Sequence, residues 1–307
     1  MNLVQLVFLK RRWWRLDSRP GYLLQSGVVS IVFGLATAVF FAAGSITASR
    51  GSRLIGAYST VAWAMLIGLV ITIPLVLIAG TPSGLAGTNS LWWAAAGVGN
   101  VTGLVFAASA FRIGKVGVIA PILATEGAIA ATIAAILGES IAPLAAFVLL
   151  VIVGGVSLAA MGKDPAPIPN ERPVRAGVLA TCGALAFGVG LYATGNLSDE
   201  LPIAWLLLPA RTVGVIALFI PLLLLKKLKL TRKAAPYVVL AGIVEVCGFT
   251  CYAIGAQYGV AVTSVLASQF APIAAIMAYL LYKEKLGKVQ IAGVAIIVAG
   301  VVTLVLL

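Results

Sequence analysis

The sequence predicts an all-α membrane protein with about ten transmembrane helices, arranged as two inverted five-helix repeats. Hydrophobic residues occupy 62% of the 307 positions and charged residues only 10%, against about 45–50% and about 25% in soluble domains. Apolar stretches follow one another almost end to end, and each is near the roughly 20 residues that cross a hydrocarbon core. The two halves of the chain also resemble each other. The lipid bilayer is therefore expected to be the main solvent of this chain.

Residues 1–25 form a basic N-terminal segment before the first long apolar stretch. Its apolar residues precede the basic cluster Lys10–Arg12, which is the reverse of a signal peptide, so we expect the segment to be retained. Trp13 and Trp14 follow the cluster and would suit the headgroup region of a membrane. We interpret the segment as interfacial, and a disordered tail is the alternative.

Ten candidate helices follow, separated by Gly, Pro and charge clusters. In the first repeat, residues 26–161, we expect helices at 26–48, 56–79, 91–111, 116–137 and 141–161. A polar, Pro-rich linker occupies residues 162–174. In the second repeat, residues 175–307, we expect helices at 175–196, 202–225, 235–257, 261–282 and 288–306.

An internal repeat supports this division of the chain. Shifting the sequence by 145 residues aligns the third expected helix with the eighth without a gap, so that Ala96, Gly97, Val101, Gly103, Ala108 and Gly114 meet Ala241, Gly242, Val246, Gly248, Ala253 and Gly259. Because five is an odd number, the second repeat must enter the membrane from the opposite side. Inverted repeats of this kind are typical of secondary transporters, whose sites lie near the midplane between the repeats.

Three ionisable residues lie deep inside the expected helices. Glu126, Arg211 and Glu245 each stand about ten residues into a helix, which is roughly 15 Å at about 1.5 Å per residue. A charge at this depth costs from about 2.5 to more than 10 kcal/mol, which makes each residue a functional candidate. The alternative is a structural Arg–Glu pair, with the second Glu permanently protonated.

In the functional interpretation, Arg211 keeps one carboxylate ionised, and the other exchanges a proton in competition with substrate. We expect Glu126 to pair with Arg211 and Glu245 to exchange the proton, because Asn100, which aligns with Glu245 in the repeat, is neutral. Asn100 and Tyr252 are expected to line the same site, although a buried Asn also serves as a contact between helices.

Several other partners are not expected. Cys182, Cys247 and Cys251 lie in apolar stretches, and the chain has no His, so neither a disulfide framework, a metal centre nor a cofactor is predicted. The net charge of +12 comes from clusters between apolar stretches, which indicate membrane topology rather than nucleic-acid binding. No nucleophile–base arrangement predicts an enzyme.

Several short motifs lie within the expected helices or at their ends: Gly138-Glu139, Lys283-Glu284, Gly155, Gly300, Gln290, Gly293 and Pro209-Ala210-Arg211. With these motifs, residues 26–307 resemble the EamA-type carriers of the drug/metabolite transporter superfamily. It implies export of small metabolites, amino acids or drug-like amphiphiles. Two departures stand out: the first repeat has Ala64–Leu66 where the second has its Arg, and Lys283 replaces a small residue.

We therefore predict a secondary active transporter, multi-pass in the plasma membrane of a bacterium, that exports a small molecule in exchange for protons. No Walker sequence is present to bind ATP. The alternative is a transporter or channel for Mg²⁺, because Glu126, Glu245 and Asn100 offer oxygen ligands. Arg211 at the same depth counts against a divalent cation.

Overall fold

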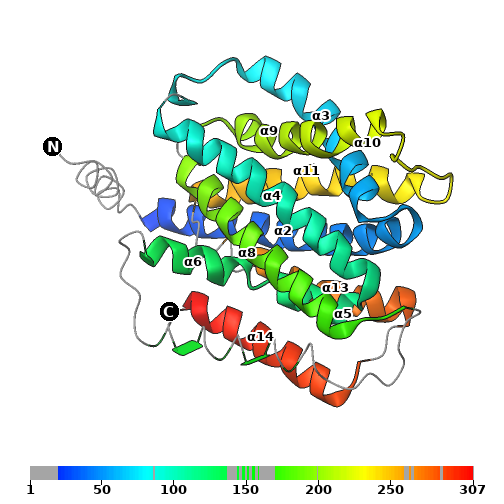
Figure 1. The fold of residues 1–307 in the computed structure, drawn as a ribbon. Coiled ribbons are helices and arrows are strands. Elements are labelled where there is room, and N and C mark those ends of the chain that lie inside the picture. Colours follow the sequence, from blue (N-terminus) through cyan, green and yellow to red (C-terminus); the bar gives the residue numbers. More distant parts are fainter. Residues whose placement is uncertain are drawn as a thin grey trace.

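The computed structural model describes residues 20–85, 87–136, 144, 147–148, 151, 154–155, 158, 170–198, 200–258, 263, 266–283 and 286–306. Every regular element in this part of the chain is helical, and the long helices lie alongside one another as a bundle (Figure 1). The expected all-α class is therefore confirmed for these residues. Most of the expected basic segment, residues 1–19, lies outside the described residues.

The first half of the chain begins with two long helices joined by a single residue. Gly56 makes this turn with φ 86° and ψ 157°, a conformation that is essentially restricted to glycine. A short 3-10 turn at Ser83–Leu85 leads into the third long helix. The helices are α2 (Pro20–Ile55), α3 (Ala57–Ala79), α4 (Thr88–Ile113), α5 (Val116–Leu123) and α6 (Glu126–Ile136).

The second half repeats this order of long helices. Its second span is composite, because α9 (Ile203–Gly214) continues through the π-helical segment η3 (Val215–Phe219) into α10 (Ile220–Leu224). The other helices are α8 (Pro173–Leu197), α11 (Ala235–Tyr258), α13 (Phe270–Tyr282) and α14 (Lys288–Leu306).

In the described part of the chain, six helices are long and apolar enough to cross a membrane: Ile31–Ile55, Ala57–Ala79, Asn89–Ile113, Pro173–Leu197, Ile203–Leu224 and Ala235–Gly255. Three shorter apolar helices cover Val116–Ala130, Leu266–Tyr282 and Lys288–Gly300. The expected fifth helix, 141–161, lies mostly outside the described residues, although those described between 144 and 158 are helical.

The fourth expected helix, 116–137, is broken rather than continuous. Between α5 and α6, the backbone N–H of Thr125 donates to the carbonyl of Ile122 at 3.2 Å, and the Thr125 hydroxyl donates to the same oxygen at 2.7 Å. Pro121, one turn earlier, has no N–H to donate to the helix. The prediction of one continuous helix was wrong here, and the break makes Glu126 the first residue of α6.

The two halves pack against each other in matching pairs. Helix α4 of the first half packs on α8 of the second, as α11 of the second half packs on α2 of the first. The contact of α4 with α9 has its counterpart in that of α11 with α3, while α3 and α9, the second helices of the two halves, pack on each other.

Two close contacts follow the 145-residue offset. A Cβ atom at Gly97 would lie 2.7 Å from the carbonyl oxygen of Pro209, and one at Gly242 would lie 2.9 Å from that of Ala64. The 145-residue offset relates Gly97 to Gly242 and Ala64 to Pro209, so the two contacts are equivalent under the repeat. Glycine at these positions lets the helix backbones approach closely.

Replacing either glycine with alanine is expected to destabilise the bundle, because no Cβ atom fits at 2.7–2.9 Å from a carbonyl oxygen. Gly97→Ala and Gly242→Ala should each cost about 1–3 kcal/mol, the usual range for overpacking. Thermal unfolding midpoints in detergent would measure the loss. Gly195→Ala is the matched control, since nothing lies within 4 Å of its Cβ position; equal midpoints for all three variants would contradict the packing.

Candidate substrate-binding site

A buried ion pair joins two helices of the second half at the centre of the bundle. The Nη1 atom of Arg211, on α9, lies 2.6 Å from Oε2 of Glu245, on α11. The two side chains are only 1% and 11% exposed. The guanidinium carbon also lies 5.8 Å from the centre of the Phe249 ring. This arrangement neutralises the Arg211 charge inside the protein.

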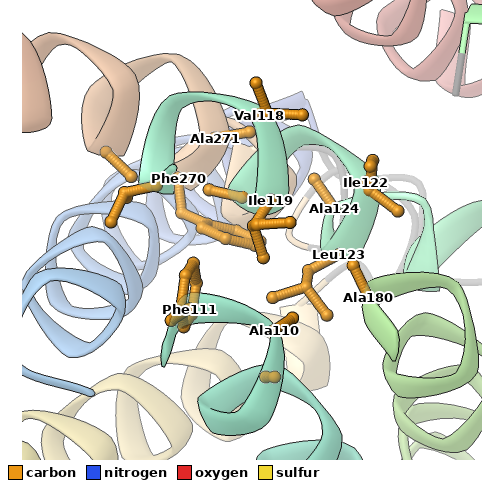
Figure 2. Close-up of a cluster of buried hydrophobic side chains, with 14 of the residues drawn as sticks. Ala110, Phe111, Val118, Ile119, Ile122, Leu123, Ala124, Ala180, Phe270 and Ala271 are labelled. Atoms are coloured by element: carbon orange, nitrogen blue, oxygen red, sulfur yellow. The ribbon is translucent and has the colours of Figure 1, made fainter. Parts of the chain in front are cut away.

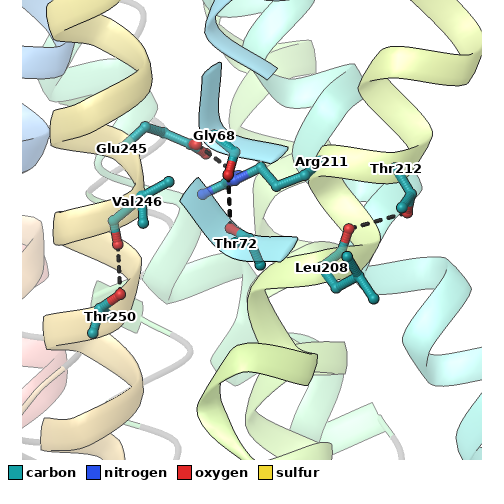
Figure 3. Close-up of polar contacts among 8 residues, drawn as sticks. All are labelled: Gly68, Thr72, Leu208, Arg211, Thr212, Glu245, Val246 and Thr250. Carbon is teal, nitrogen blue, oxygen red and sulfur yellow. Dashed lines mark hydrogen bonds and ion pairs between the residues drawn. The ribbon is translucent and has the colours of Figure 1, made fainter. Parts of the chain in front are cut away.

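Gly68 of α3 provides the space in which the Arg211 side chain lies. A Cβ atom at Gly68 would stand 2.9 Å from both Cδ and Nε of Arg211. Figure 3 shows the guanidinium beside Gly68 and directed toward Glu245. The second helix of the first half, α3, has no Arg. At Gly68 it instead leaves space for the Arg211 side chain of the second half.

A cavity of about 110 Å³ lies between the two halves. Its wall is mostly apolar and includes six phenylalanines, Phe40, Phe41, Phe111, Phe187, Phe249 and Phe270. Its polar lining residues are Ser45, Thr60, Asn100, Glu126, Thr194 and Glu245. Helices α2 to α6 of the first half and α8, α11 and α13 of the second half supply these residues.

One wall of the cavity belongs to the main hydrophobic cluster. Figure 2 shows α5 packed through Ile119 and Leu123 among residues of α4, α8 and α13. Phe111, Leu123 and Phe270 belong both to this cluster and to the cavity lining. The wall is therefore held by core packing.

Glu126 faces the same cavity but without a counter-ion. It is the first residue of α6 and is only 9% exposed. Among the described residues, the Arg211–Glu245 contact is the ion pair of the site, and no cation or hydrogen-bond donor side chain contacts the Glu126 carboxylate.

The expected pairing of Arg211 with Glu126 was wrong, because Glu245 takes that place. Helix α9 packs directly on α11, whereas α6 packs on α8. The depth of a residue along its helix does not determine which helices lie next to it. Depth alone therefore could not show whether Glu126 or Glu245 pairs with the guanidinium. This pairing makes Glu245 the compensated carboxylate, and its expected proton-exchanging role stays a prediction.

The remaining predicted residues lie at different distances from the cavity. Asn100 lines the cavity, faces Glu245, and has an Oδ1 atom without a hydrogen-bond partner among the described residues. Tyr252 is 3% exposed and packs with Ala267 and Leu191 rather than lining the cavity. Leu191 lines the cavity, so Tyr252 lies behind its wall.

The six phenylalanines were missed in the sequence. They lie on five helices, α2, α4, α8, α11 and α13, and aromatic residues inside apolar helices are usually core residues. Phe40 and Phe41 are adjacent in a stretch where charge is absent, which was the only available signal.

The chain matches the model of the EamA-like transporter family in two parts, over residues 28–161 and 175–306. It belongs to this family. The resemblance seen in the short motifs is thereby confirmed, and the protein is a membrane transporter of the drug/metabolite superfamily, a class without enzymatic activity. Its six apolar spans agree with a multi-pass membrane protein.

A chain of known structure, described only as "Crystal structure of protein", resembles this EamA-like transporter in fold. The two share 18% sequence identity at a TM-score of 0.56, over 92% of this chain and 96% of that chain. No curated protein matches the sequence.

The ion pair is expected to show strong coupling between its two residues. Arg211→Met or Glu245→Met alone would leave one buried charge unpaired, at a cost of about 3–5 kcal/mol. The double variant leaves no unpaired charge and should be more stable than either single variant. The free energy of unfolding would be measured in mixed micelles for the wild type, the two single variants and the double variant. If the double variant loses as much stability as the two single variants together, the contact contributes nothing.

Proposed function

We propose that this EamA-like transporter is a secondary active exporter that moves a small metabolite, amino acid or drug-like amphiphile in exchange for protons. Its site would lie near the membrane midplane between two inverted five-helix repeats. The observation that supports this proposal is a cavity lined by both halves, which contains a buried carboxylate that has no counter-ion among the described residues. A site shared by two halves is what alternating access requires.

The matching contacts between the halves support the inverted arrangement. Exchange of the halves converts the α4–α8 contact into the α11–α2 contact, and the Gly97–Pro209 approach into the Gly242–Ala64 approach. Contacts that exchange in this way are expected when a pseudo-two-fold axis relates the two halves. If each half has five spans, which is an odd number, that axis lies in the membrane plane.

Proton coupling is assigned to Glu126. Arg211 and Glu245 together are neutral, so the ionised site has a net charge of minus one, located on Glu126. An ionised carboxylate without a partner is costly in an apolar cavity. A bound proton or a cationic substrate removes this cost, and the two therefore compete for the same carboxylate.

The cavity suits Mg²⁺ less well than an organic molecule. Magnesium requires near-octahedral oxygen ligands and retains several waters. Here Glu245 is already bound by Arg211, and most of the wall is apolar. In the described part of the chain, no three acidic, thiol or imidazole groups are placed to hold a metal ion.

Transport by purified protein in liposomes tests the function. Amines, amino acids, sugars, organic acids and Mg²⁺ would be compared with and without a pH gradient. We expect the gradient to accelerate the flux of at least one organic solute. Flux of Mg²⁺ alone, or flux of no solute in response to the gradient, would contradict the proposal.

Glu126→Gln is expected to abolish the acceleration by the pH gradient, because an amide neither binds nor releases the proton. The loss should be at least about tenfold, the size of one charge-assisted contact. Glu200→Gln serves as the control, since Glu200 is exposed and does not line the cavity. Unchanged gradient dependence in Glu126→Gln would remove Glu126 from the coupling role.

A further inference from the structure

We infer that the solute bound in this cavity is a protonated amine on an apolar, preferably aromatic, body, and that it is selected over amino acids and organic acids. This inference rests on the proposed carrier function and specifies its substrate class. The juxtaposition that supports it is an unpaired carboxylate, an unpaired amide oxygen and six phenylalanine side chains around one cavity.

The polar atoms available in the cavity are hydrogen-bond acceptors. The three hydroxyl groups already donate to carbonyls of their own helices, Ser45 to Phe41, Thr60 to Gly56 and Thr194 to Gly190, at 2.8–3.0 Å. Each hydroxyl oxygen therefore offers a solute only its lone pairs.

The stronger acceptors of the cavity are Glu126 and Asn100. Glu126 has no cation or donor among the described residues, and Oδ1 of Asn100 has no hydrogen-bond partner there. The Asn100 amide faces Glu245. A solute that brings N–H donors and a positive charge would satisfy the free acceptors of the lining residues. The buried N–H groups without a hydrogen-bond partner among the described residues, Nε and Nη2 of Arg211, belong to a residue that does not line the cavity.

Among the described residues, Arg211 carries the buried guanidinium, and it does not face an anionic solute in the cavity. Arg211 is 1% exposed, is held by Glu245, and is not among the residues that line the cavity. An amino acid would have to place its carboxylate against Glu126 or Glu245, against an apolar side chain, or against hydroxyls that already donate to backbone carbonyls. Each of these contacts is repulsive or leaves the carboxylate without a hydrogen bond.

The apolar body of the solute matches the rest of the wall. Phe187 lies on α8 next to Gly188, whose Cβ position would be 3.1 Å from the backbone oxygen of Glu126. The backbone of α8 beside Phe187 therefore lies close to the first residue of α6, and Phe187 and Glu126 line the same cavity. Aromatic faces attract organic cations, by about 0.5–2 kcal/mol per contact.

Four ligands that share one phenyl ring test the inference: 2-phenylethylamine, 2-phenylethanol, phenylacetate and phenylalanine. Binding to the detergent-solubilised full chain would be measured by calorimetry at neutral and at mildly acid pH. We expect the amine to bind at least about tenfold more tightly than the other three, the size of one charge-assisted contact. Mild acid should weaken amine binding, because protons compete for Glu126.

Glu126→Gln should reduce the preference for amine over alcohol by about tenfold and remove its pH dependence, while Glu200→Gln keeps both. Phe187→Leu, which retains apolar volume, should weaken amine binding about threefold through loss of the ring face. The wild-type ligand series decides the question even if a variant fails to fold.

The possible failures are distinguishable. Equal binding of amine and alcohol, or tighter binding of phenylacetate or phenylalanine, overturns the amine inference. If the pH gradient nevertheless drives flux of an acid or an amino acid in liposomes, the carrier function stands and only the substrate class is wrong. If amine binds but no solute responds to the gradient, the coupled carrier is wrong and the amine site remains.

Discussion

The charge of one buried arginine constrains the centre of this transporter. A guanidinium remains protonated under all ordinary conditions, so a helix that places it inside the bilayer must be packed beside an anion. Arg211 meets this requirement through Glu245 on the adjacent α11 and through the space left by Gly68 on α3. Three helices, taken from both halves, are thereby fixed around one side chain.

The chemistry of the cavity follows from that pairing. Glu245 lines the cavity but is compensated, so Glu126 is the lining carboxylate without a counter-ion among the described residues. The helix break at Ala124 and Thr125 places this residue at the start of α6. Because the nearby hydroxyls donate to their own helices, the cavity combines apolar rings with acceptors. Residues of both halves line the cavity, whereas the lining carboxylate that Arg211 does not compensate, Glu126, comes from the first half.

The two halves pack their helix backbones in similar ways but differ in the side chains that they place at the site. Gly97 and Gly242 make equivalent close contacts with Pro209 and Ala64. At the level of the site, Asn100 stands opposite Glu245 in the alignment, and Leu66 opposite Arg211. Among the described residues, two nearly equivalent halves thus enclose the Arg211–Glu245 pair without a symmetry-related second pair. The first half adds a carboxylate of its own, Glu126, so the side chains of the cavity depart from the symmetry of the frame.

The sequence by itself determined the membrane class, because hydropathy and helix length depend only on composition and order along the chain. It also determined the two halves, through the 145-residue offset, and it selected Glu126, Arg211, Glu245 and Asn100 by their depth. Only the tertiary structure decided that Arg211 pairs with Glu245, that Tyr252 lies behind the cavity wall, and that phenylalanines from five helices meet. Position along a helix is written in the sequence, whereas its rotation and its neighbours are set by packing among all the helices at once.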